Sequence, residues 1–276
     1  MSLRIGRIPY VNCYPVYGAV DRGLVSLDGE LISGVPTSLN KLMAAGSLDI
    51  SVVSAVEYAR DSARYVLLPD LAISCDGPVR SVMLFSKRSA PDLDGRRVLI
   101  SRSSMTAVAL LELLFQHVWR AEPEFIPGDA EIDDIGGFGD EPHEARLVIG
   151  DAALLLNDSA TIYPYHYDLG AEWKAWTGLP FVFAVWVAQR TTAVAEALRV
   201  HAGLIASRDW GLAHLDVLAE QAAANTRMSL SVCHEYLSGL DYRLSYPHLA
   251  GLTDFFRRLV LDGHVPDGRL AFLPAA

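Results

Sequence analysis

Short apolar runs alternate with longer amphipathic stretches over the first two thirds of the chain. Residues 3–8, 48–54 and 145–150 are short apolar runs bounded by polar or turn-forming residues, which is typical of buried strands. Residues 102–119 instead carry apolar side chains at helical spacing. The alternation of strand and helix patterns predicts an α/β fold with largely parallel sheets.

The order of these elements predicts two lobes, the second inserted in the first. Two α/β stretches are separated by the polar, turn-rich segment 88–97, and only helical patterns follow the apolar run 181–189. We therefore expect a discontinuous first lobe (1–86 with 187–276) and an inserted second lobe (87–186). Two-lobed α/β proteins of this kind usually bind their ligand between the lobes, at strand carboxyl ends and helix N-termini.

The composition narrows the choice of partners. Of the 276 residues, 51% are apolar, and 23 Lys and Arg face 33 Asp and Glu, for a formal charge of −10. Such a surface repels nucleic acid and anionic membranes, so we expect neither as a partner. A small anion remains compatible with it, because backbone N–H groups at helix N-termini bind anions locally. The sequence leaves the oligomeric state open.

No motif indicates a metal or another cofactor. The three cysteines are far apart, the eight histidines lack tight metal-ligand spacing, and neither a phosphate-binding loop nor a dinucleotide fingerprint is present. Three reduced, mostly buried thiols are the expected state of the cysteines. The first residues lack the pattern of a secretory signal, and no apolar run is long enough for a membrane span. We therefore expect a soluble, cytoplasmic protein without a cofactor.

The segment SRSSMT follows one predicted strand and begins the long helix of residues 102–119. Ser103 or Ser104 is placed to cap that helix, and Thr106 lies in its first turn. Free N–H groups, the helix dipole and the hydroxyl groups together suit an anion, although an ordinary N-cap explains the same residues.

Small polar residues also occupy three other junctions between a strand and a helix. These are Asn12, between two prolines, Ser54 and Asp151. Each alone is most often a cap or turn residue. Together with SRSSMT they predict a cleft lined by neutral donors. Ser81, inside the apolar run VRSVMLF, is a further polar group that either bonds to backbone or faces the cleft.

Several longer segments resemble the chorismate dehydratase family. They occur in family order between about residues 4 and 188 and include RIPYVNCYPV, SVVSAVEYA, DGPVRSVMLFSK, IGDAALL and DLGAEWKAWTGLPFVFAVW. That family forms 3-[(1-carboxyvinyl)oxy]benzoate in the futalosine route to menaquinone. The resemblance implies the two-lobed fold of type II periplasmic binding proteins, with chorismate as a small dicarboxylate substrate.

The resemblance also implies roles for individual residues. Asn12 and Ser81 would lie closest to the reacting ring, and the segment Ser103–Ser104–Met105–Thr106 would hold a substrate carboxylate. The family often has a second serine after the threonine, where this chain has Ala107.

The sequence leaves open which base removes the ring proton. One hypothesis is that the enolpyruvyl carboxylate of the substrate takes the proton while Asn12 and Ser81 hold it in place. Asp151 is the alternative. Two other functions compete with the dehydratase: 1,4-dihydroxy-6-naphthoate synthase, a sister enzyme of the same pathway and fold, and a cytoplasmic binding protein for a small carboxylate.

Overall fold

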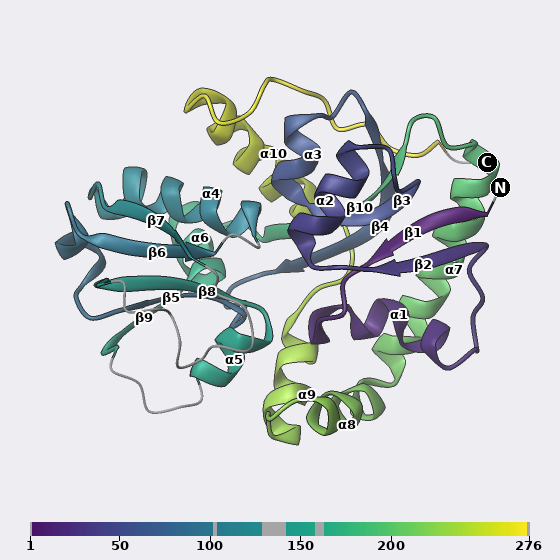
Figure 1. The fold of residues 1–276 in the computed structure, drawn as a ribbon, viewed down its shortest axis with the longest axis horizontal. Helices are drawn as coiled ribbons and strands as arrows, with labels where there is room; N and C mark the ends of the chain where they lie inside the picture. Colours follow the sequence, from purple (N-terminus) through teal and green to yellow (C-terminus); the bar gives the residue numbers. More distant parts are fainter. Residues whose placement is uncertain (1, 102–103, 129–141, 158–162, 275–276) are drawn as a thin grey trace.

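The computed structural model describes residues 2–101, 104–128, 142–157 and 163–274, which fold into two five-stranded sheets with helices around each (Figure 1). The first sheet has the order β2-β1-β3-β10-β4, formed by Gly29–Ser33, Leu3–Arg7, Ile50–Ser54, Phe181–Gln189 and Tyr65–Cys75. The second has the order β7-β6-β8-β5-β9, formed by Glu124–Gly128, Arg97–Ser101, Ala145–Ile149, Val82–Ser86 and Tyr165–Asp168.

Both sheets are mixed rather than largely parallel. β1 runs parallel to β2 and β3, and β6 runs parallel to β7 and β8. In contrast, β10 is antiparallel to β3 and β4, and β5 is antiparallel to β8 and β9. β5 and β10 are the strands that enter a sheet directly from the other lobe, so the crossing sets their direction instead of a βαβ unit.

The sheet pairing favours lobe boundaries a few residues earlier than those predicted. β5, placed in the first lobe by the sequence, pairs in the second sheet. The predicted return at residue 187 falls inside β10, which pairs in the first sheet from Phe181 onward. An apolar strand pattern shows that a strand is buried on both faces but does not show to which sheet the strand belongs. The predicted lobe boundaries therefore fall a few residues later than those of the sheets.

Helices cover the sheets of both lobes, and the described residues after β10 contain helices without another named strand, as predicted. The second lobe carries α4 (Met105–Leu114), the π-helical turn Phe115–Trp119, α5 (Asp151–Asn157) and α6 (Leu169–Thr177). The first lobe carries the 3-10 turn η1 (Val11–Cys13), α1 (Tyr14–Asp21), α2 (Pro36–Ala44), α3 (Ala55–Arg60), α7 (Val194–Ala213), α8 (Leu215–Asn225), α9 (Leu230–Gly239) and α10 (Tyr246–Leu261).

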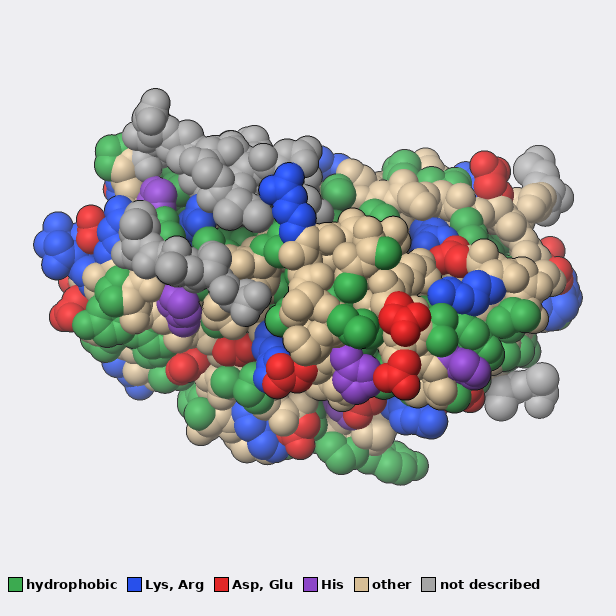
Figure 2. Space-filling view, turned by 90° about the horizontal axis from the view of Figure 1, so that it is seen from below, with side chains coloured by type: hydrophobic (Ala, Val, Ile, Leu, Met, Phe, Trp, Pro, Cys, Tyr) green, Lys and Arg blue, Asp and Glu red, His purple; other side chains and the backbone are tan. Residues whose placement is uncertain are grey.

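One face of the first lobe carries charged side chains of both signs. On the face formed by α8 and α9, acidic, basic and histidine side chains are interspersed (Figure 2).

Cys13, Cys75 and Cys233 are buried and unpaired with one another. Among the described residues, no helix combines the length and the apolar character needed to span a bilayer.

The contact between α1 and α7 depends on a glycine. A Cβ atom added to Gly211 would lie 2.2 Å from the backbone oxygen of Pro15, closer than any relaxed contact. We expect Gly211→Ala to lower the free energy of unfolding by about 1–3 kcal/mol, because the two helix backbones must move apart. Urea unfolding measures this change. Gly239→Ala is the matched control, since a Cβ there meets nothing within 4 Å. Equal losses in both variants would contradict the close-approach explanation.

Candidate active site

A cavity of about 70 Å³ lies between the two lobes and is lined from both. The ends of β1, β3 and β8, the starts of α2 and α4, and the segment that leads into β5 meet there. Its lining consists of Ile8, Tyr10, Asn12, Pro36, Ser54, Ile73, Val79, Ser81, Val82, Ser104, Ile149, Gly150, Phe183 and Ala184. None of these side chains carries a charge, so polar contacts in the cavity come from neutral groups and backbone.

Asn12 lies in the cavity wall and does not cap a helix. The N-cap of η1 is Tyr10 and that of α1 is Cys13, and neither cap is made by a side chain. The Oδ1 atom of Asn12 is buried without a hydrogen-bond partner among the described residues. A buried carbonyl oxygen left unpaired costs about 1–3 kcal/mol, so such a group is usually kept for a ligand or for catalysis.

Ser81 is 4% exposed and also lines the cavity. It follows Arg80, whose φ of 63° lies in the left-handed region that non-glycine residues rarely adopt. Asp168 holds this segment, because its carboxylate accepts the backbone N–H groups of Val79 at 3.0 Å and Arg80 at 2.6 Å. The carbonyl of Ser81 accepts the N–H of Gly150 at 2.7 Å. The backbone of Ser81 is thus fixed from two sides.

Ser54 both caps α3 and reaches the cavity. Its Oγ accepts the N–H of Glu57 at 3.2 Å and a hydrogen bond from Asn40 Nδ2 at 3.0 Å. Asn40 Oδ1 in turn accepts the N–H of Ser54 at 3.2 Å. Asn40 is 3% exposed, and the hydrophobic pattern of the sequence does not mark it as a site residue. The one indication in the sequence is that Asn40 lies between Leu39 and Met43 on the apolar side of a helix, where a polar side chain needs a partner.

The segment that begins α4 contacts the first lobe through two of its side chains. Ser104 Oγ caps the helix by accepting the N–H of Ala107 at 3.2 Å, and Ser104 also lines the cavity. Thr106 Oγ1 accepts the N–H of Val56 at 3.2 Å, and Met105 Sδ accepts a hydrogen bond from Asn40 at 3.2 Å. Ser103, the other predicted cap, lies outside the described residues.

Asp151 lies beside the cavity but is not part of its lining. Its side chain does not cap α5; instead, Oδ1 accepts the N–H of Val11 from the other lobe at 3.4 Å. The residue is 9% exposed, and this burial raises the pKa of its carboxyl group to about 6. Asp151 therefore contacts the segment that carries Asn12.

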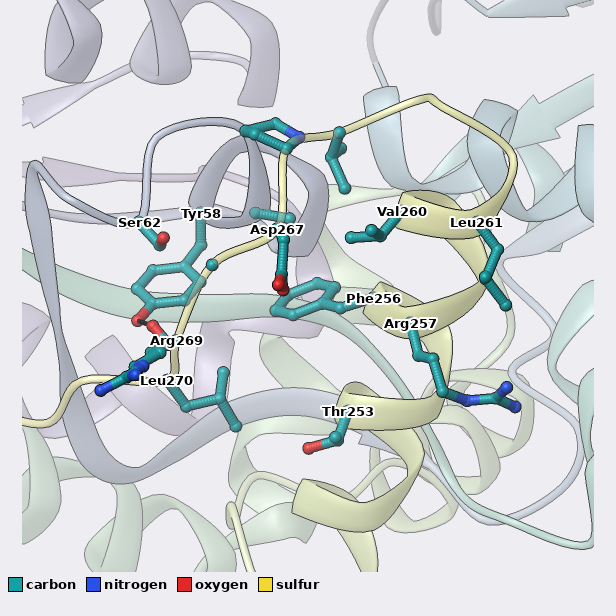
Figure 3. A pocket seen from close by; sticks show the side chains of 14 residues that line it. Tyr58, Ser62, Thr253, Phe256, Arg257, Val260, Leu261, Asp267, Arg269 and Leu270 are labelled. Atoms are coloured by element: carbon teal, nitrogen blue, oxygen red, sulfur yellow. Dashed lines mark hydrogen bonds between the residues drawn. The ribbon is translucent and has the colours of Figure 1, made fainter.

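A larger cavity, of about 520 Å³, lies in the first lobe (Figure 3). It is formed by α3, α10 and the segment 265–270, with the rings of Tyr58 and Phe256 stacked in its wall. None of the predicted site residues lines it.

Within the residues that the structure describes, no group of three or more His, Cys, Asp or Glu side chains is arranged to hold a metal ion.

Two α/β lobes joined by two crossing strands, with a neutral polar cleft between them, define the class of folds found in periplasmic binding proteins. A crystal structure from Archaeoglobus fulgidus superposes with a TM-score of 0.79 at 19% identity, covering 95% of this chain and 98% of that one. The periplasmic aliphatic sulphonate binding protein of Escherichia coli superposes with a TM-score of 0.64 at 14% identity, covering 96% and 94%. Both likenesses support the fold.

Residues 3–260 match the menaquinone biosynthesis family, and the chain belongs to that family. A chorismate dehydratase of Thermus thermophilus is 32% identical over 270 residues, which cover 92% of this chain and 96% of the relative. A 1,4-dihydroxy-6-naphthoate synthase of the same organism is 28% identical over 197 residues, covering 68% and 66%. Both of these relatives are enzymes.

Proposed function

We propose that the protein is a chorismate dehydratase, a carbon–oxygen lyase that converts chorismate into 3-[(1-carboxyvinyl)oxy]benzoate and water. The observation that carries this proposal is the 32% identity to the Thermus thermophilus chorismate dehydratase over nearly the full length of both chains. We place the reaction in the futalosine route to menaquinone and in the cytoplasm, as the sequence led us to expect.

The chemistry of this elimination suits the cleft. Chorismate loses its ring hydroxyl group together with the hydrogen on the carbon that bears the enolpyruvyl ether. That hydrogen is vinylogous to the ring carboxylate, so its removal gives a delocalised anion, and loss of hydroxide then yields a benzene ring. The reaction requires orientation and donors near the developing charge, which neutral side chains and backbone N–H groups supply.

Asn12 and Ser81 are the side chains that we assign to the reacting part of the substrate. Asn12 Oδ1 is unpartnered in the wall of the cleft, which supports its assignment as a substrate contact. Ser81 approaches from the segment between the lobes, on a backbone fixed by Asp168. Ser54 and Ser104 also line the cavity, and we assign them, with Ser103, Met105 and Thr106 as the resemblance implies, to polar groups of the substrate.

The substrate's own enolpyruvyl carboxylate is the base that this arrangement favours. Among the described residues, the cavity lining contains neither a carboxylate nor a histidine. Asp151, the alternative base, directs Oδ1 to the N–H of Val11. This contact supports assigning the proton transfer to the substrate, with the amide N–H groups of Asn12 and the hydroxyl group of Ser81 as the donors that orient the carboxylate over the ring.

Incubation of the purified protein with chorismate tests the proposal. We expect a product lighter by one water, with a meta-substituted aromatic ring and the enolpyruvyl group retained, identified by mass spectrometry and proton NMR. Heat-unfolded protein is the control for spontaneous chorismate breakdown. Folded protein that leaves chorismate unchanged would contradict the assignment.

The two alternatives predict different results in the same assay. A 1,4-dihydroxy-6-naphthoate synthase would leave chorismate intact and release a naphthoate from its own substrate. A binding protein would raise its unfolding temperature with chorismate without converting it. The weaker and shorter match to the naphthoate synthase makes that enzyme the second candidate.

A further inference from the structure

The pair Gly150–Asp151 contacts both segments that carry the assigned side chains. The N–H of Gly150 donates to the carbonyl of Ser81 at 2.7 Å. The carboxyl group of Asp151 accepts the N–H of Val11, the residue immediately before Asn12, at 3.4 Å. Val11 and Asp151 are 140 positions apart in the sequence and belong to different lobes. One turn between β8 and α5 thus bridges the two lobes beside the cleft.

We propose that Asp151 is a positioning residue, which fixes the Asn12 segment relative to Ser81 by accepting the Val11 N–H across the lobes. Asn12 lies in a 3-10 turn without side-chain caps, so its placement depends on contacts of its backbone. Val11 is fully buried, and its N–H lies at the start of the turn, where the turn itself supplies no acceptor. Among the described residues, Asp151 supplies the acceptor for this N–H.

The surroundings of Asp151 leave it as the group whose charge changes near neutral pH. Its charge interacts with the thiol of Cys13 on η1 and with Tyr236 and Cys233 on α9. Burial raises the pKa of the Cys13 thiol to about 12 and also raises the pKa values of Tyr236 and Cys233. These three groups are therefore neutral where the carboxyl group of Asp151 titrates.

The protonation state of Asp151 sets the strength of the contact. An ionised carboxylate accepts an N–H more strongly than a protonated carboxyl group does. Because burial raises the pKa of Asp151 to about 6, the contact is strongest above pH 6 and weakens as pH falls through that value. The positioning role thus predicts an acid limb in the pH profile of kcat/KM near pH 6, which disappears when Asp151 is replaced by asparagine.

Three substitutions test the contact from its two sides. Asp151→Asn keeps an oxygen acceptor without a titrating group, whereas Asp151→Ala removes the acceptor. Val11→Pro removes the donor and leaves Asp151 in place. Tyr10, the residue before Val11, has ψ of 157°, the extended conformation that a following proline requires. Proline is also tolerated at the first position of a helical turn.

Chorismate turnover by these variants between pH 5 and 8 tests the role, which rests on the proposed function. We expect Asp151→Asn to keep kcat within about tenfold of the wild-type value and to lose the acid limb. Asp151→Ala and Val11→Pro should each lower kcat/KM by about 10–100-fold, and the double variant should be no worse than Val11→Pro, because both changes remove one contact.

Two outcomes would overturn the proposal. Loss of about 10³-fold or more in kcat by Asp151→Asn at every pH would make Asp151 the base. If Asp151→Ala kept wild-type kinetics and the wild-type pH profile, Asp151 would have no positioning role. Amide hydrogen exchange at Val11 tests the contact without substrate: exchange should accelerate in Asp151→Ala but not in Asp151→Asn, and unchanged exchange in Asp151→Ala would overturn the contact. Failure of wild-type protein to convert chorismate, with the exchange result intact, would reject the function and not the contact.

Discussion

Replacement of Asn12 by alanine is expected to lower kcat for chorismate by about 10²–10³-fold, the usual cost of removing a preorganised polar contact at a reacting centre. The same change should leave the free energy of unfolding unchanged or raise it by about 1 kcal/mol, because it removes a buried carbonyl oxygen without a partner. Activity and stability would then move in opposite directions. Steady-state kinetics and urea unfolding on one preparation measure both quantities.

Asn225→Ala is the matched control for Asn12→Ala. Asn225 ends α8 on the surface and donates Nδ2 to the phenol oxygen of Tyr14 at 3.3 Å. Its replacement should change neither kcat nor the free energy of unfolding by more than about 0.5 kcal/mol. Full turnover by Asn12→Ala would show that Asn12 is not a substrate contact. A parallel fall in activity and stability would instead assign it a structural role.

The alternation of strands and helices, and the polar residues at the strand ends, could be predicted because they depend on local patterns. A short apolar run followed by a small polar residue and a helix places that residue at the end of a strand, where clefts form in α/β folds. This reasoning predicts a cleft position for Asn12, Ser54 and Ser104, and all three line the cavity between the lobes. It does not separate a helix cap from a ligand contact, since Ser54 and Ser104 do cap helices while Asn12 does not.

The remaining features depend on contacts between distant segments. The direction of β5 and β10 follows from the path of the chain between lobes, which hydrophobic periodicity does not record. Asn40 looks like a helix residue until it meets Ser54 and Met105. Asp151 shares a local pattern with the other junctions, yet its carboxyl group faces Val11 instead of the cavity.

Asp168 is the clearest example of a role that local sequence could not reveal. Its pattern is that of an N-cap, and Oδ1 does accept the N–H groups of Gly170 at 2.9 Å and Ala171 at 3.0 Å. The same carboxylate also accepts the N–H groups of Val79 and Arg80 from almost 90 positions earlier in the chain. One side chain therefore joins the start of α6 to the segment that presents Ser81.

We expect Asp168→Ala to lower the free energy of unfolding by about 2–4 kcal/mol, because four N–H groups lose a charged acceptor. We also expect kcat to fall at least about tenfold in protein that is still folded. Without Asp168, the left-handed backbone at Arg80, a conformation that costs of order 1 kcal/mol, is free to relax and to carry Ser81 away from the cleft. Urea unfolding and chorismate turnover well below the unfolding midpoint measure the two effects.

Asp76→Ala is the control for Asp168→Ala, because it also removes a carboxylate next to α6. Asp76 is 58% exposed at its side chain and pairs with Lys174 at 2.5 Å on the surface of that helix. An exposed pair of this kind contributes at most about 1 kcal/mol, so Asp76→Ala should be nearly neutral for stability and for turnover. If Asp168→Ala lost stability but kept wild-type kcat, the segment 79–81 would be held without Asp168. The placement of Ser81 would then depend mainly on its bond from Gly150.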